Sequence, residues 1–377
     1  MTSTPLGGAG TAFRTAHRKA HTLKPRRNVF HHPAKLLSTG LVLLSLLVGI
    51  GASAPPVSAE SSTRGLYGAA DPQWDGAFRQ ALGILGLLAV GSQPSQDAVS
   101  WLINQQCDNG SFQAFRADLT KPCAPPDPDA GVGPQVDSTA LAAVALLRIG
   151  TAASTKAANK AMAWIARQQR PDGGWPYIAT GTSNANSTGL AMVAWRAVEG
   201  ARATSSINKG TRFLGTLVQP CSAQEGARLS YGPGTAPDWS ATAQGALGLT
   251  GSLPVSTTKG LKLQAPCTGT TASRVDSALS QGLQTTPLLP SSFGTGPDQT
   301  STAFAVLALV SAGKGRGGVS AARSALADSA GEYTMGSAGA DPAAIGLLMM
   351  VAEATGENPN DFGGVNLVRL LQSSERR

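Results

Sequence analysis

Three aspartates stand where long apolar runs begin. Asp137, Asp238 and Asp298 open the runs "DSTALAAVALLRIG", "DWSATAQGALGLTG" and "DQTSTAFAVLALVSAG". Carboxyl groups gathered at one place can act as general acid and base in glycoside hydrolysis, or as an acid kept protonated by an apolar site. An aspartate that begins a helix also serves as an N-cap, which every helix needs. Capping is the favoured interpretation, and Asp137 and Asp238 are the candidate catalytic carboxylates of the alternative.

Other chemistry is restricted by where the histidines and cysteines lie. The four histidines all fall within residues 1–35, so a chain that loses this segment has no histidine for a triad or for zinc ligation. An even number of cysteines in an exported chain indicates two disulfides among three pairings, and we favour the sequential pairing because each bond then staples one long connection. A four-thiolate metal site is the alternative, although no Cys-x-x-Cys is present. The cysteines are Cys107, Cys123, Cys221 and Cys267.

The N-terminal segment has the order of a secretory signal. Seven basic residues precede the apolar run 41–50, and small residues follow, with cleavage expected after Ala59 or Ala54. The run is short for a membrane span, which needs about 20 residues, although an uncleaved anchor is the alternative. Without residues 1–59 the chain keeps 23 basic against 22 acidic residues. That balance removes the basic footprint expected of a nucleic-acid partner. We expect residues 60–377 to form one secreted domain with no stable membrane span.

A repeat of about fifty residues organises this domain. Six runs such as "NSTGLAMVAWRAVEG" start with a polar residue, continue as alanine, leucine and valine, and stop at a glycine, which predicts helices that are apolar on nearly every face. The closing glycines, expected as C-caps, are Gly91, Gly150, Gly200, Gly251, Gly313 and Gly356. Between the runs lie one-sided helices, predicted over residues 96–106, 155–169, 206–219, 274–284, 319–327 and 365–373.

Six buried helices that alternate with six amphipathic ones predict an all-α fold. An inner ring of six surrounded by an outer ring of six buries every apolar run, and ring closure pairs the first buried helix with the last amphipathic one. An open solenoid would instead need polar capping repeats at its ends. The prediction is a closed (α/α)6 toroid.

The stretch "QQRPDGGW", residues 168–175, resembles the glutamine-tryptophan repeat of the prenyltransferase and squalene cyclase superfamily, whose members share such a toroid. "QQCDNGSF" is a second copy with Phe112 in the place of Trp175, and Gln219 begins a degraded third copy with Tyr231 as its aromatic. The amide can bond backbone groups at a helix end and the aromatic can pack on the next inner helix. The resemblance implies that this joint opens on the mouth of a central cavity.

The motifs of the best-known catalytic members are absent. The chain has no Asp-x-Asp-Asp acid of the class II terpene cyclases, no histidine in residues 60–377 for the zinc site of the protein prenyltransferases, and no Gly-Cys-Gly-Glu-Gln thioester motif. The secreted, disulfide-bonded barrels of the intrinsic factor and transcobalamin family need none of these motifs. Their resemblance implies a corrinoid as a ligand, with the second, β-rich half of the clamp supplied by another chain.

Two functions follow from the sequence. The favoured one is a secreted binding protein that takes a small amphipathic molecule, such as a corrinoid, or a partner protein such as a β-rich clamp or a transporter at the cavity mouth. The alternative is an enzyme, either terpene cyclase-like or carbohydrate-active, that uses Asp137 and Asp238. The candidate ligand contacts are Phe112, Asp137, Ser138, Thr139, Trp175, Tyr177, Asn186, Ser187, Thr188, Tyr231, Asp238, Trp239, Gln299 and Thr300.

Overall fold

The computed structural model describes residues 63–377 apart from residues 199, 225, 258–259, 265 and 293. The leader assigned to residues 1–59 and the four histidines lie outside the described residues. The described residues belong to one compact unit, residues 55–377.

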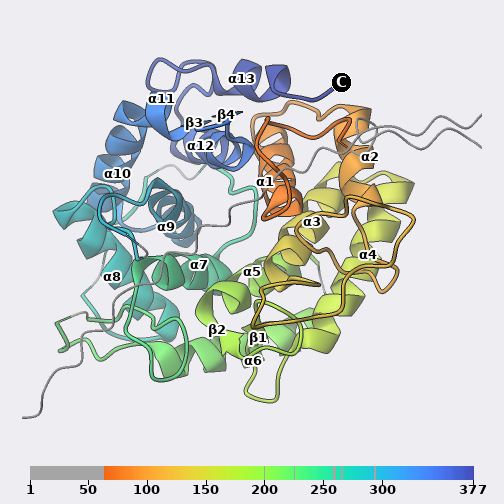
Figure 1. Ribbon diagram of the computed structural model, residues 1–377. Coiled ribbons are helices and arrows are strands. Elements are labelled where there is room, and N and C mark those ends of the chain that lie inside the picture. The colour runs from red at the N-terminus through yellow and green to blue at the C-terminus, as the bar shows by residue number, and fades with distance from the viewer. Residues whose placement is uncertain (1–62, 199, 225, 258–259, 265, 293) are drawn as a thin grey trace, which may run out of the picture. The chain divides into compact units, whose positions relative to one another are not determined.

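Six helices form a closed inner ring. Their order around the ring is α1, α3, α5, α7, α9 and α12, each packs on the next, and α12 returns to α1 (Figure 1). Their side chains supply most of the buried apolar core. The bounds are α1 (Gly76–Ala89), α3 (Val136–Ile149), α5 (Ala185–Arg196), α7 (Trp239–Thr250), α9 (Gln299–Ala312) and α12 (Pro342–Thr355).

Six amphipathic helices cover this ring from outside. Four of them, α4, α6, α8 and α10, each pack against two neighbouring inner helices, whereas α2 packs on α1 and α13 on α12. The outer helices are α2 (Gln96–Asn104), α4 (Ala152–Gln168), α6 (Ala201–Leu217), α8 (Thr271–Thr285), α10 (Arg316–Asp328) and α13 (Leu367–Ser373). The predicted all-α toroid, with its alternation of buried and one-sided helices, is confirmed.

Short elements occupy the joints that lead from outer to inner helices. β1 (Trp175–Pro176) pairs antiparallel with β2 (Ser183–Asn184) before α5. The short helix α11 (Ala330–Tyr333) and the hairpin of β3 (Met335–Gly336) and β4 (Gly339–Ala340) precede α12. These joints place their side chains beside the N-termini of the inner helices.

The helix ends correct part of the sequence prediction. Gly150, Gly313 and Gly356 end their helices in the left-handed conformation, as predicted. Gly200 instead precedes α6 as its N-cap, and Gly251 ends α7 in extended backbone. The C-cap of α1 is Val90, with Gly91 following it in the left-handed conformation, and the C-cap of α5 is Ala197. The prediction of glycine C-caps is therefore wrong for Gly91 and Gly200.

The two disulfides follow the favoured pairing. Cys107 is bonded to Cys123 and Cys221 to Cys267. The first bond closes the long connection between α2 and α3, and the second ties the chain after α6 to the segment before α8. A metal site built from four thiolates is thereby excluded.

The ring closes through the two ends of the described chain. The amide of Gly65 donates to the carbonyl of Arg376 over 2.8 Å, and the amide of Arg376 donates back to Leu66 over 2.9 Å. The Arg376 guanidinium donates to the carbonyls of Gly68 and Ala70. Hydrogen bonds therefore join the segment before α1 to the segment after α13.

Removal of residues 374–377 is expected to lower the free energy of unfolding by about 2–5 kcal/mol, since several hydrogen bonds of about 0.5–1.5 kcal/mol each are lost. Urea unfolding followed by circular dichroism measures this change. Arg377→Ala, at the exposed last residue, serves as the control and should leave the transition in place. Equal urea midpoints for the truncated and full chains would show that closure of the ring does not depend on the hydrogen bonds of residues 374–377.

Candidate functional site

The best-preserved joint is a structural connection. The amide of Gln169 donates to the carbonyl of Gly173 in its own turn and to that of Ser206 in α6, each over 2.9 Å. Trp175 is fully buried, and its indole nitrogen donates to the carbonyl of Ile165. Gln106 repeats the amide pattern one joint earlier, with Gly110 and Ala157 as its acceptors. The motif therefore links successive outer helices.

A buried threonine in the first turn of four inner helices fixes the register of these joints. Each threonine hydroxyl accepts the backbone N–H at the motif's aromatic position, over 2.9 or 3.0 Å. The pairs are Thr139 with Phe112, Thr188 with Trp175, Thr242 with Leu229 and Thr302 with Leu289. The third repeat thus carries Leu229 at the aromatic position, which corrects the assignment of Tyr231 to that role.

Thr188→Val is expected to lower the free energy of unfolding by about 1–3 kcal/mol, because the isosteric change leaves the buried amide of Trp175 without its acceptor. Chemical denaturation monitored by tryptophan fluorescence would test this. Thr204→Val, at an exposed position of α6, is the control and should change stability by less than about 0.5 kcal/mol. Equal losses in the two variants would contradict a specific role for Thr188.

The corrected register makes Tyr231 the equivalent of Tyr177, because each lies two residues after the aromatic position. The carbonyl of Tyr177 accepts the amide of Val136 at the start of α3, and that of Tyr231 accepts the amide of Ala185 at the start of α5. Both tyrosines are exposed: Tyr177 has 37% of its surface accessible and Tyr231 has 42%. Each joint therefore holds a tyrosine beside the N-terminus of the preceding inner helix.

Asp137 lies beside these tyrosines and does not cap its helix. The N-cap of α3 is Gln135, and no side chain caps this helix end, so the capping interpretation is wrong for Asp137. Part of the residue is exposed, but its Oδ1 is enclosed and has no hydrogen-bond partner among the described residues. Burial raises the pKa of Asp137 to about 7, and the Ser187 hydroxyl beside it acts in the opposite direction. Asp137 is therefore an acid that changes protonation near neutral pH.

Electrostatic effects link Asp137 to both tyrosines. Burial, and then the negative charge of Asp137, raise the pKa values of Tyr177 and Tyr231 above their usual range. Asp75 at the start of α1 adds to the effect on Tyr177, and Asp238 adds to the effect on Tyr231. Asp137 in the first turn of α3 therefore lies near Tyr177 and Tyr231, whose carbonyls bond to the starts of α3 and α5. This face of the ring, beside the N-termini of the inner helices, is called the mouth.

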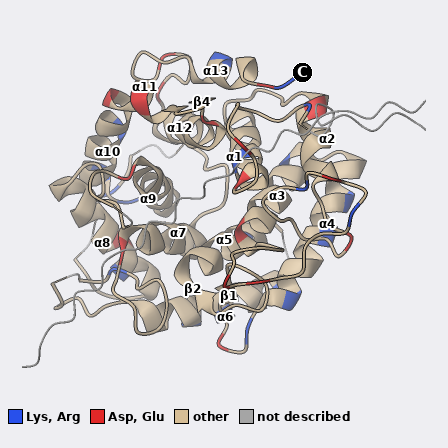
Figure 2. Ribbon diagram, in the orientation of Figure 1, with Lys and Arg blue, Asp and Glu red and all other residues tan. Residues whose placement is uncertain are grey.

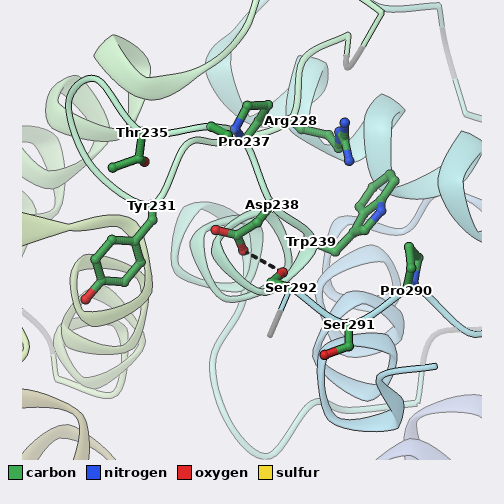
Figure 3. Close-up of a pocket in the computed structure, with 10 residues that line it drawn as sticks. Arg228, Tyr231, Thr235, Pro237, Asp238, Trp239, Pro290, Ser291 and Ser292 are labelled. Atoms are coloured by element: carbon green, nitrogen blue, oxygen red, sulfur yellow. Dashed lines mark hydrogen bonds between the residues drawn. The ribbon is translucent and has the colours of Figure 1, made fainter. Parts of the chain in front are cut away.

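A pocket of about 610 Å³ lies at the start of α7. Tyr231 lies on one side of Asp238 and Trp239 on the other (Figure 3). The Arg228 guanidinium lies 4.8 Å from the centre of the Trp239 ring. The sequence prediction missed several of its lining residues, because they belong to Gly- and Pro-rich connections without periodicity; these are Arg228, Pro237, Pro290, Ser291 and Ser292.

The carboxylates of Asp238 and Asp298 are helix caps, as the favoured interpretation predicted. Asp238 Oδ1 accepts the amide of Ala241 over 2.7 Å and also the hydroxyl of Ser292 over 3.2 Å. Asp298 accepts the amide and the hydroxyl of Ser301. Of the three aspartates that prompted a catalytic hypothesis, only Asp137 has an oxygen that is buried and unpartnered within the described residues.

Other predicted contacts lie elsewhere. Phe112, Trp175, Thr139 and Thr188 are fully buried and offer no surface to a ligand. The Ser138 hydroxyl donates to the side chain of Gln135. Gln299 and Thr300 begin α9, farther round the ring, and Thr300 bonds the hydroxyl of Tyr333. Asn186 faces α7, where its amide nitrogen donates to Ser240.

Basic residues gather on two outer helices, α4 and α6. They are Lys156, Lys160 and Arg167 on α4 and Arg202, Lys209 and Arg212 on α6 (Figure 2). The described residues contain no cluster of His, Cys, Asp and Glu that could hold a metal ion. Nor do they include a helix with the length and apolar character needed to cross a membrane.

Comparison with known proteins finds a family model that matches part of the chain. Residues 90–228 match the model of the squalene-hopene cyclase C-terminal domain. No curated protein sequence matches the chain.

Three solved structures show partial likeness. A type II terpene cyclase from Scytonema has 13% identity over 71% of this chain and 76% of its own, with a TM-score of 0.43. A sugar epimerase from a ruminal bacterium has 10% identity over 77% and 92%, with a TM-score of 0.49. A glycosidase has 15% identity over 78% and 91%, with a TM-score of 0.46. The family match over residues 90–228 supports the resemblance to the prenyltransferase and squalene cyclase superfamily, and the closed double ring of helices is the toroid that this resemblance implied.

Proposed function

We propose that the chain is a secreted binding protein that takes a small amphipathic molecule at the mouth of the toroid. One observation carries the proposal: the pocket at the start of α7 is lined by apolar and by polar side chains. Tyr231, Trp239 and Pro290 provide the walls, and Asp238 and Ser292 provide the polar groups (Figure 3). An apolar hollow with a few convergent polar groups is the general form of a ligand site.

An extracellular location suits this chain. The leader predicted from residues 1–59 is typical of secretion, and two disulfides persist in an oxidising environment. An extracellular binding protein then needs a partner to pass its ligand onward. Tyr231 exposes 42% of its surface, so it lies at the open edge of the pocket. A ligand packed on its ring would keep one side open to solvent. A β-rich clamp domain or a transporter could cover that side.

Ligand binding is tested most directly by thermal unfolding of the full chain with both disulfides formed. The probes are cyanocobalamin, farnesol and neutral oligosaccharides, each added separately. A ligand at 100 times its dissociation constant stabilises the folded state by about 2.7 kcal/mol, which shifts the midpoint by several degrees. We expect one probe class to raise the midpoint, and Tyr231→Ala to reduce that shift.

Leu263→Ala is the matched control. Leu263 exposes 73% of its surface but lies outside the pocket, between α7 and α8, so the shift should be retained. No shift with any probe class would contradict the proposed binding function. A shift with cyanocobalamin alone would favour the corrinoid version of it.

The alternative, an enzyme, is supported by Asp137. An acid with a pKa near 7 can donate a proton at neutral pH, and the enclosed Oδ1 has no competing hydrogen-bond partner among the described residues. Asp238 suits the role less well, because its carboxylate already accepts the amide of Ala241 and the hydroxyl of Ser292. Turnover that is abolished by Asp137→Asn and kept by Asp238→Asn would favour this function.

A further inference from the structure

The mouth displays a series of exposed aromatic rings. Trp74, Tyr177 and Tyr231 are the exposed aromatic side chains among the described residues, with 75%, 37% and 42% of their surfaces accessible. All three belong to segments beside the N-termini of inner helices. Large apolar side chains gathered on one exposed face indicate a binding surface.

The rings form a connected series. Trp74 and Tyr177 line one pocket of about 370 Å³, whereas Tyr231 and Trp239 line the pocket of about 610 Å³. Tyr177 and Tyr231 lie on consecutive joints, because their carbonyls accept the amides of Val136 and Ala185 at the starts of the neighbouring helices α3 and α5. A ligand that engages the whole series must therefore be extended.

One enclosed oxygen beside these rings calls for a hydrogen-bond donor. Asp137 Oδ1 is buried without a hydrogen-bond partner among the described residues, and the charge of Asp137 acts on both tyrosines. An ionised carboxylate only accepts hydrogen bonds. A ligand with hydroxyl groups would supply the donor that this oxygen lacks.

The acidic side chains near the tyrosines restrict the charge that a ligand can carry. The carboxylates of Asp75, Asp137 and Asp238 surround the two tyrosines, so an anionic ligand would be repelled. Two of the three are already engaged, Asp75 by the Arg79 guanidinium over 2.6 Å and Asp238 by the amide of Ala241. No cation among the described residues acts on the third, Asp137, which burial leaves partly protonated at neutral pH. A neutral ligand fits this balance better than a cationic one.

We propose that the mouth binds a neutral oligosaccharide, whose sugar rings stack on Trp74, Tyr177 and Tyr231. The apolar C–H face of a sugar packs on an aromatic ring, while its hydroxyl groups donate to oxygens at the edge of that ring. The proposal rests on the proposed binding function and names the ligand class of the same site. It requires an extended chain of sugars, because the stacking surfaces belong to two pockets.

Isothermal titration calorimetry of the full chain tests this with defined probes. These are maltohexaose, cellohexaose, mannohexaose, glucose and the anionic hexamer of galacturonic acid. We expect at least one neutral hexamer to bind. Glucose should bind much more weakly, and the anionic hexamer should not bind. Tyr177→Ala and Tyr231→Ala should each weaken binding about tenfold, as expected when one stacked ring and its buried area are lost.

Conservative variants separate stacking from folding. Tyr177→Phe and Tyr231→Phe keep the ring and should keep most of the affinity, and Leu263→Ala should bind like the unchanged chain. If no neutral hexamer binds while farnesol or cyanocobalamin does, the carbohydrate inference is overturned and the proposed function stands. If none of the probes binds, both are overturned. Affinity in the Tyr177→Ala and Tyr231→Ala variants that equals that of the unchanged chain would also overturn the inference.

Discussion

Gly189→Ala is expected to destabilise the fold by about 2–4 kcal/mol, although alanine in an open helix interior stabilises by about 1 kcal/mol relative to glycine. The reason is the crossing of α5 and α7. A methyl group at Gly189 would come within 2.2 Å of the carbonyl oxygen of Gln244, and one at Gly248 within 2.4 Å of the carbonyl oxygen of Gly189. Both obstacles are backbone atoms, so the two helices must move apart.

Gly317→Ala provides the control for this change. Gly317 is exposed near the start of α10, where a methyl group would meet only the side chain of Gln284 at 3.5 Å. This variant should be neutral or slightly more stable. Denaturant unfolding of both variants gives the comparison, and stabilisation by Gly189→Ala would contradict the tight crossing.

Much of the toroid can be predicted from the sequence, whereas close helix crossings such as this one cannot. Apolar runs with alanine and glycine on every face require burial on all sides, and the alternating one-sided helices supply the cover. Both signals are local, so the double ring follows from them. Gly86 and Gly346 make a similar close contact between α1 and α12, where a methyl group at Gly86 would lie 2.6 Å from the Cα of Gly346. The pairing of particular glycines depends on the folded ring and has no local signal.

Errors of register account for most of what the sequence missed at the mouth. Asp137 looked like an N-cap because it precedes an apolar run, but α3 already begins at Val136. Tyr231 looked like the aromatic of a degraded joint, whereas Leu229 takes that place through its bond to Thr242. Each error spans only a residue or two. At a helix N-terminus that shift decides whether a side chain caps the backbone or faces the mouth.

The pocket itself had no sequence signal because it joins distant segments. Arg228 comes from the connection after α6, and Pro290, Ser291 and Ser292 come from the connection after α8. Their meeting depends on the closed ring, which brings consecutive joints side by side. Turn residues in such connections can be identified from the sequence, but their partners across the mouth cannot.

Asp137→Asn is expected to stabilise the chain by about 1–4 kcal/mol at pH 8 and much less at pH 4. Burial raises the pKa of Asp137 to about 7 in the folded state, against about 3.9 for an unfolded aspartate. The unfolded state therefore releases this proton first, and the folded state loses stability as the pH rises from about 4 to 7. Asparagine does not titrate, so it removes this loss. One pKa unit corresponds to about 1.4 kcal/mol, which sets the upper bound.

Asp276→Asn distinguishes this effect from a general response to pH. Burial also raises the pKa of Asp276, to about 6, while Lys314 at 3.4 Å acts in the opposite direction. Its pH-dependent contribution should therefore be complete by about pH 6, whereas that of Asp137 continues to about pH 7. Urea unfolding at intervals between pH 4 and 8 resolves the two windows. A constant difference between Asp137→Asn and the unchanged chain across that range would show that Asp137 is ionised throughout, and an acid role for it would then lose its support.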